Sequence, residues 1–93
     1  MIAHLKGQLT YKSPEYTIVD VNGVGYQVFT PLSTYYALPG LGQTVSLRVH
    51  TRVREDELKL FGFLTKEEQT IFQKLITINK VGPRVALGIL SGM

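Results

Sequence analysis

Hydrophobic and polar residues alternate along much of the first 63 residues, with the period of two that is typical of half-buried strands. In residues 44–54, for example, Val45, Leu47 and Val49 share one face. Asn22-Gly23 lies between two such runs and is a strong hairpin signal, because these residue types tolerate a positive φ. The pattern predicts strands over residues 2–9, 16–21, 24–30, 44–54 and 58–63.

Residues 31–38 interrupt the strands and predict a short helix or helical turn, started by Ser33 and stopped at Pro39-Gly40. Three strands, a short helix and two more strands follow the order of elements in a five-stranded OB-fold-like barrel. A plain antiparallel meander is the competing interpretation of the same pattern.

The hydrophobic period changes from two to about 3.6 near Leu64, which indicates a boundary between two architectures. Thr65 and Glu68 have the spacing of a capping box and predict that a helix starts there. Its expected apolar stripe is Ile71, Phe72, Leu75, Ile76 and Ile78, and a second short helix is expected to carry Val85, Ala86, Leu87, Ile89 and Leu90. The sequence therefore predicts a barrel over residues 1–63 and a helical hairpin over residues 64–93.

Composition narrows the class of protein. The 93 residues contain no cysteine, which excludes disulfide scaffolds, thiolate zinc sites and cysteine nucleophiles. A net charge of +3 is a mild basic bias that suits nucleic acid but is also common elsewhere. No segment approaches the length needed to span a bilayer, so we expect a cytoplasmic protein with no membrane partner.

The turn between the two expected helices, residues 79–84 (NKVGPR), is the strongest functional signal. Gly82 is expected to adopt a backbone conformation that bulkier residues avoid, and Pro83 suits the first position of a helix. The free amides of that helix, with Lys80 and Arg84, would form a site for a phosphate. The segment is thus typical of a DNA-binding helix-hairpin-helix, and the alternative is an ordinary helical hairpin whose glycine only makes the turn.

A second signal is the acidic turn of Glu55, Asp56 and Glu57, which follows Arg52 and Arg54. One interpretation is a solvated turn whose charges keep a sheet edge soluble. A metal site for phosphodiester cleavage is a weaker one, because adjacent residues at a turn tip diverge rather than converge on an ion. In the third, the fixed carboxylates repel the DNA backbone from one place while the helical hairpin holds it.

The remaining candidate chemistry is weaker. His4 and His50 lie far apart with no third ligand at metal spacing, so we interpret both as structural. Exposed aromatic residues on a barrel would suit a generic OB-fold module that binds single-stranded DNA. Most of the tyrosines and phenylalanines fall at strand-alternation positions, so packing explains them better.

The barrel pattern, together with residues 53–56 (VRED), 60–63 (LFGF) and 79–87 (NKVGPRVAL), closely resembles the RuvA family of bacterial Holliday-junction recognition proteins. The similarity covers the whole chain. It implies non-catalytic recognition of four-way DNA junctions by a homotetramer, in support of branch migration. By this resemblance Glu55 and Asp56 match an acidic pin that guides strand separation at the crossover.

The resemblance also implies a set of DNA-contacting residues in a first helix-hairpin-helix: Asn79, Lys80, Val81, Gly82 and Arg84. Arg54 is expected either to reach toward DNA or to pair with a neighbour such as Glu57. Family members continue into a second helix-hairpin-helix and a domain that binds the RuvB motor. This chain therefore looks truncated and is expected to lack motor binding. A RuvC-type resolvase is a further implied partner, and no cofactor, metal or catalytic residue is expected.

Overall fold

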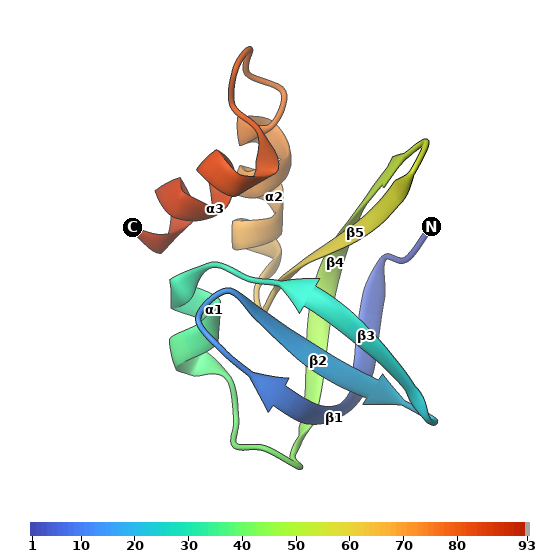
Figure 1. Cartoon of the computed structure of the whole chain (residues 1–93). Coiled ribbons are helices and arrows are strands. Elements are labelled where there is room, and N and C mark those ends of the chain that lie inside the picture. The colour runs from blue at the N-terminus through green and yellow to red at the C-terminus, as the bar shows by residue number, and fades with distance from the viewer. Residues whose placement is uncertain (93) are drawn as a thin grey trace.

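The computed structural model describes residues 1–92, which form five strands and three helices. In chain order these are β1 (His4–Lys12), β2 (Tyr16–Val21), β3 (Val24–Phe29), α1 (Leu32–Ala37), β4 (Thr44–Arg54), β5 (Glu57–Phe63), α2 (Lys66–Leu75) and α3 (Pro83–Ser91). The strands close into a barrel in the order β1-β2-β3-β5-β4 (Figure 1). Only the β3–β5 pairing within this barrel is parallel. This order, with a helix between β3 and β4, confirms the OB-type barrel over the meander.

The barrel core comes from the alternation seen in the sequence. Leu9, Val19, Val28 and Leu47 are fully buried, and each lies on the inner face of a different strand. Strand β1 pairs with β2 along one half and with β4 along the other, and its register shifts between Leu9 and Tyr11. Such a bulge bends a strand, which lets β1 close the barrel.

Several boundaries differ from the predicted ones. Strand β1 was expected over residues 2–9 but runs from His4 to Lys12. Ile2 lies outside the strand, where its amide donates to Thr51 Oγ1 at 3.0 Å. Strand β5 begins one residue earlier than predicted, because Glu57 already pairs with Arg54 across the hairpin.

The expectation that Ser33 starts the short helix is wrong. Helix α1 has Pro31 at its N-cap, and no side chain caps it. Ser33 lies inside the helix, and its hydroxyl donates to Glu68 Oε2 at 2.6 Å. The serine therefore joins α1 to α2 instead of capping its own helix.

Helix α2 starts as predicted, since the Thr65 hydroxyl accepts from the Glu68 amide at 3.2 Å. The Glu68 carboxylate accepts from the hydroxyls of Ser33 and Thr65. Ile78 does not continue the apolar stripe as expected: the helix ends at Leu75, and Ile78 lies 54% exposed in the following turn.

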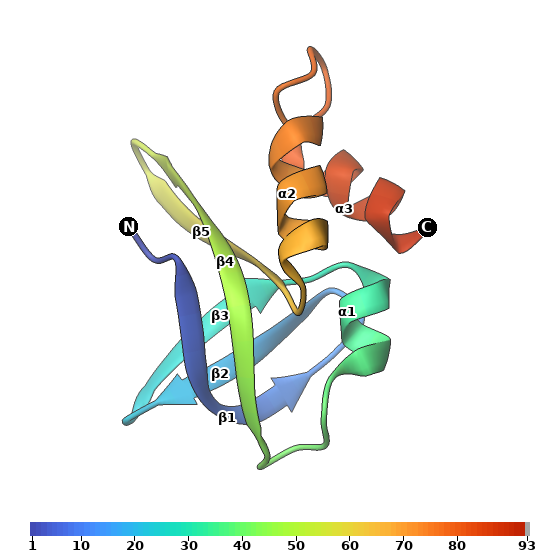
Figure 2. The same cartoon turned by 180° about the vertical axis from the view of Figure 1, so that it is seen from behind.

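The two long helices share a second core with the outer face of the barrel. Phe72 on α2 is fully buried, with its ring centroid 5.0 Å from that of Phe63 and 5.3 Å from that of Phe61. Ala86 and Leu90 on α3 complete this cluster. Figure 2 shows the helix pair standing over the end of the barrel beside the β4–β5 hairpin. No helix within residues 1–92 is long and apolar enough to cross a membrane.

Candidate nucleic-acid interface

The acidic residues occupy the tip of the β4–β5 hairpin. Because Arg54 pairs with Glu57 in the strand register, Glu55 and Asp56 are the two turn residues, and both are exposed. The hairpin extends beyond the barrel into solvent (Figure 1). Two exposed carboxylates are thus held at the end of a two-stranded ladder.

Arg54 is opposite Glu57 in the backbone register but forms no ion pair with it, which was one of its two expected roles. Among residues 1–92 the one ion pair is between Glu57 Oε1 and Lys59 Nζ, at 3.8 Å. Arg54 is exposed beside the tip, so its guanidinium is accessible to a ligand.

In the turn between α2 and α3, the residue with the left-handed backbone conformation is not the expected one. Gly82 was expected to provide it, but its φ of −87° and ψ of 175° are ordinary extended values. Lys80 has the positive φ, 71°, and the Val81 amide then donates to the Ile78 carbonyl at 3.0 Å. A Cβ added to Gly82 would meet nothing within 4 Å. Neither backbone conformation nor internal packing therefore explains a glycine at position 82.

Gly82 is the N-cap of α3, and Pro83 is the first helical residue, as predicted. The first intrahelical hydrogen bond runs from the Ala86 amide to the Gly82 carbonyl at 3.0 Å. By helix geometry the amides of Arg84 and Val85 have no acceptor within the helix. The first turn of α3 contains no acidic residue, so the positive end of the helix dipole is uncompensated there. This end can receive an anion.

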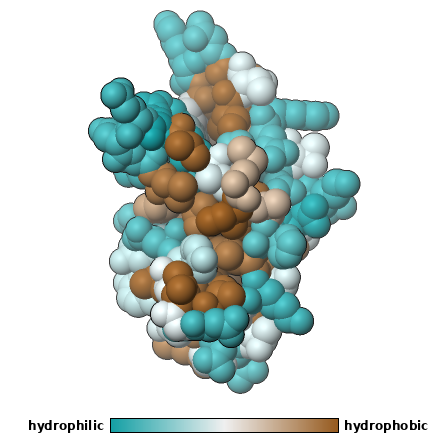
Figure 3. Space-filling model, turned by 90° about the vertical axis from the view of Figure 1, so that its right-hand side faces the viewer, coloured by the Kyte–Doolittle hydropathy of each residue, from teal (hydrophilic) through white to brown (hydrophobic). Residues whose placement is uncertain are grey.

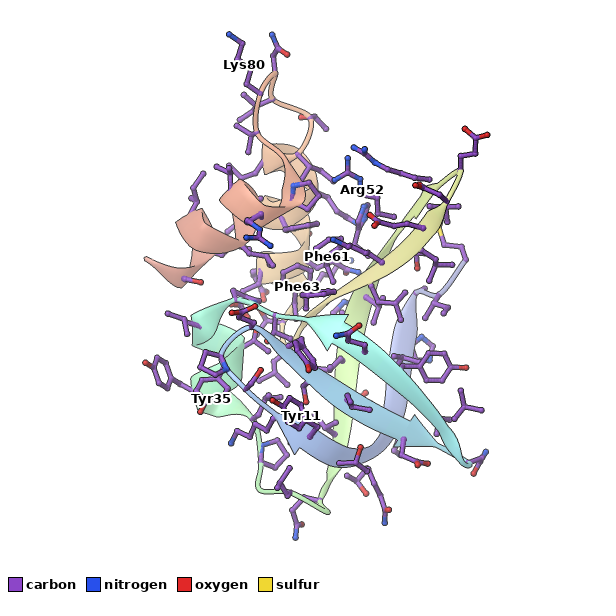
Figure 4. All side chains as sticks on the ribbon, in the orientation of Figure 1. Tyr11, Tyr35, Arg52, Phe61, Phe63 and Lys80 are labelled. Carbon is purple, nitrogen blue, oxygen red and sulfur yellow. The ribbon has the colours of Figure 1, made fainter. Side chains whose placement is uncertain are left out.

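The other predicted DNA-contacting residues lie around this helix start. Asn79 and Lys80 are exposed in the turn, and Figure 4 shows Lys80 at its outer end, pointing away from the body of the molecule. Val81 is partly buried and packs against the helix cluster, so its side chain is the least accessible of the set.

A cleft of about 410 Å³ separates the base of the hairpin from the start of α3. Its cations are Arg52, Lys59 and Arg84. Arg52 lies between the hairpin and the helix pair (Figure 4) and is directly opposite Lys59 in the strand register. Sequence reasoning did not single out Lys59. The signal was present, because counting back from the turn places positions 52 and 59 opposite each other on the outer face.

Of the two histidines, His4 is exposed on β1 and His50 packs against the helix pair. His50 lies edge-on to Phe72, with ring centroids 5.5 Å apart, and partial burial lowers its pKa below the usual 6.5. Within residues 1–92, no three His, Cys, Asp or Glu side chains are grouped so that they could hold a metal ion.

The fold and the two turns define a class: an OB-type barrel with an acidic hairpin and an appended helix pair whose second helix has no acidic residue in its first turn. Residues 1–62 match the family model described as the RuvA N terminal domain. The chain belongs to this family.

Two relatives show how far the similarity extends. The chain is 56% identical over 93 residues to the Holliday junction branch migration complex subunit RuvA of Syntrophobacter fumaroxidans, which covers 100% of this chain and 47% of that protein. It is 58% identical over 91 residues to the protein of the same name in Geobacter sp. strain M21, covering 98% of this chain and 46% of that protein. The chain thus spans about half the length of the curated relatives it matches.

Proposed function

We propose that this chain recognises four-way Holliday junctions of DNA without catalysis, as the N-terminal part of a RuvA-type subunit. The observation that carries the proposal is the position of the two turns. The hairpin with the acidic tip and the α2–α3 turn project from the same end of the molecule (Figures 1 and 2), and one cleft lies between the base of the hairpin and the start of α3. The names of the relatives, which are subunits of a Holliday junction branch migration complex, support it.

In this proposal, α2, the turn and α3 act as a helix-hairpin-helix that binds the DNA backbone. The open space over Gly82 lets a phosphate approach the free amides of Arg84 and Val85. Lys80 and Arg84 add charge, and Asn79 adds an amide donor at the outer end of the turn. Such contacts position a duplex but do not read its sequence.

Glu55 and Asp56 act as the acidic pin. Their fixed negative charges repel a phosphate that approaches the tip. Repeated around the axis of a homotetramer, the pins discourage an uninterrupted duplex from occupying the centre. Arg54 reaches toward DNA beside the pin.

Assembly into a tetramer is supported by apolar surface on the hairpin side. Val53 and Leu58 lie opposite each other in the hairpin and are 65% and 58% exposed. Figure 3 views this side, where apolar surface lies among polar surface. Covering this apolar pair with another chain would remove it from water, which favours assembly through the hairpin side.

For the full-length protein we propose a RuvB-type motor as partner, with a RuvC-type resolvase as another, in the cytoplasm. The names of the relatives place them in a branch migration complex, which supports a motor as partner. We assign this chain no cofactor and no catalytic residue.

The test is the affinity of the chain for a synthetic four-way junction, a linear duplex and a single strand, across a salt series. We expect junction preference, with phosphate contacts giving a negative slope against salt. The double variant Glu55→Gln/Asp56→Asn should bind duplex more tightly and lose much of that preference. Glu67→Gln, a matched change at an exposed acid on α2, should leave it intact.

Two outcomes would contradict the proposal. Unchanged selectivity in the double variant would show that Glu55 and Asp56 do not act as a pin. Preference for the single strand over the junction would favour a generic OB-fold single-strand binder.

A further inference from the structure

The cleft between the hairpin and α3 has features that a phosphate grip alone does not need. Phe29 and Phe61 form an apolar wall on the barrel side, and Val85 and Leu87 line the helix side. The ring centroids of Phe29 and Phe61 are 6.0 Å apart. The cleft therefore has apolar side chains on two of its sides.

The charges in the cleft are of both signs. Lys59 Nζ lies 5.4 Å from the centre of the Phe29 ring and 3.8 Å from Glu57 Oε1. Arg52 and Arg84 add two cations, and Glu15 adds a second carboxylate. With three cations against two carboxylates the cleft still attracts an anion, and the acids add acceptors for N–H donors. A ligand with N–H donors at one end and negative charge at the other complements both.

Thr30 in the cleft wall has an incomplete set of hydrogen bonds. Its side chain is 3% exposed, and its hydroxyl has no partner within residues 1–92. Burying a hydroxyl without a partner is costly, but this oxygen is shielded from solvent, so a ligand would reach it only after the cleft wall moved. The volume of about 410 Å³ also lies within the range of small-molecule pockets, about 300–1,000 Å³.

We infer that this cleft binds one unpaired nucleotide of a single DNA strand. The base lies between the Phe29 and Val85 walls, and the N–H at its hydrogen-bonding edge faces Glu57. Arg52 and Lys59 hold the adjoining phosphate. The inference rests on the proposed function in one respect, that DNA binds at this end of the molecule. It adds a binding site for an unpaired single strand.

A row of rings extends from the cleft and offers a path for the neighbouring bases. Phe29 is followed by Tyr16, at a centroid distance of 5.9 Å, and Tyr16 by Tyr11 at 5.2 Å. Tyr11 is 43% exposed and stacks on Tyr16 with the ring planes 28° apart. Aromatic platforms of this kind bind bases with little sequence preference.

The experiment titrates the isotope-labelled 93-residue chain with a short oligothymidylate and with an abasic oligomer of the same length and charge. Neither probe contains a duplex or a crossover. We expect amide shifts at Phe29, Lys59 and Val85, and binding of the abasic oligomer about five-fold or more weaker, as loss of base stacking predicts. Equal binding of the two probes would overturn the inference, because the cleft would then recognise phosphate only.

Variants locate the site without touching the residues of the proposed junction grip. Arg52→Ala/Lys59→Ala should weaken oligothymidylate binding and reduce its salt slope by about 0.7 for each phosphate that is no longer neutralised. The matched control is Lys6→Ala/Lys66→Ala, which removes two exposed cations away from the cleft. An equal loss of affinity in the control would show general charge attraction and would also overturn the inference. Junction preference is measured separately, so either proposal can fail while the other stands.

Discussion

The two projecting turns of this molecule are supported in different ways. The acidic tip lies at the end of a backbone ladder that runs from the Arg48–Phe63 pair to the Arg54–Glu57 pair. The α2–α3 turn is supported by side-chain packing of the helices on β5, around Phe72. A core substitution should therefore displace the cationic turn and leave the carboxylates where they are.

The turns also differ in sign and in what they offer a ligand. The tip presents side-chain carboxylates, which act through charge alone. The start of α3 presents backbone amides, which require close approach and so depend on the space over Gly82. Charge reversal or neutralisation should be the effective change at the tip, and added bulk should be the effective change at the helix start.

The largest expected effect is that of Phe72→Ala, which weakens the packing that supports the α2–α3 turn but leaves the β4–β5 ladder intact. Removing this fully buried ring from its contacts with Phe61 and Phe63 should lower the free energy of unfolding by about 3–5 kcal/mol. Urea denaturation measures the decrease. Amide spectra should show larger changes in α2 and α3 than in β1 and β2.

Phe72→Leu is the graded control for this change. It preserves most of the apolar volume and should cost less than about 1.5 kcal/mol if the site can repack. A decrease of less than about 1 kcal/mol for Phe72→Ala would mean that the helix pair is held by something other than this cluster.

Gly82→Ala should have the next largest effect, on DNA binding rather than on stability. The new methyl group meets no protein atom and the backbone is extended, so folding should be little affected. A charge-assisted hydrogen bond between an amide and a phosphate is worth about 1.5–3 kcal/mol, so blocking it should lower junction affinity by about ten-fold or more.

Gly88→Ala is the matched control for position 82. Gly88 lies inside α3, is exposed, and also has open space around its Cβ position. Alanine there should stabilise the helix by about 0.5–1 kcal/mol and leave DNA binding unchanged. Equal affinity of the Gly82→Ala variant and the unaltered chain would show that the helix start is not the grip.

The barrel and the helix start at Thr65 could be predicted from the sequence because their signals are local. Alternation, the Asn22-Gly23 turn and the Thr65–Glu68 spacing each act over a few residues. The parallel β3–β5 pairing and the bulge in β1 could not, since both result from closing the barrel between distant segments. The unexpected link from Ser33 to Glu68 is likewise a contact between residues 35 positions apart.

The candidate site was only partly predictable for a similar reason. The carboxylates at the tip and Pro83 at the start of α3 follow from the turn signals. The left-handed conformation falls on Lys80 because the turn closes through the Val81 amide, and a residue preference for glycine does not reveal that. The cleft needs two elements to meet, so Lys59 became a candidate only when the fold was known.

The smallest expected effect is a pH dependence at the base of the helix pair. Burial lowers the pKa of His50 below 6.5, so the unfolded chain binds a proton more readily than the folded chain does. The stability that neutral His50 provides is thus present above about pH 6.5 and is lost as the pH falls toward the lower pKa of the folded state. Charging this ring disturbs its edge-on contact with Phe72 and its 3.4 Å contact with Gln73. The acidic tip makes no contact with His50, so we expect this loss of stability to affect the helix pair and not the tip.

Urea unfolding midpoints of the unaltered chain and of His50→Gln, measured at about pH 7.5 and about pH 5.5, test this link. The unaltered chain should lose more stability between the two values than the variant does. Both proteins retain the exposed His4 and all carboxylates, so titrations common to both cancel in the comparison. An identical pH dependence would mean that protonation of His50 does not change the free energy of unfolding. Apolar packing alone would then hold the helix pair on the barrel, and Phe72→Ala tests that packing.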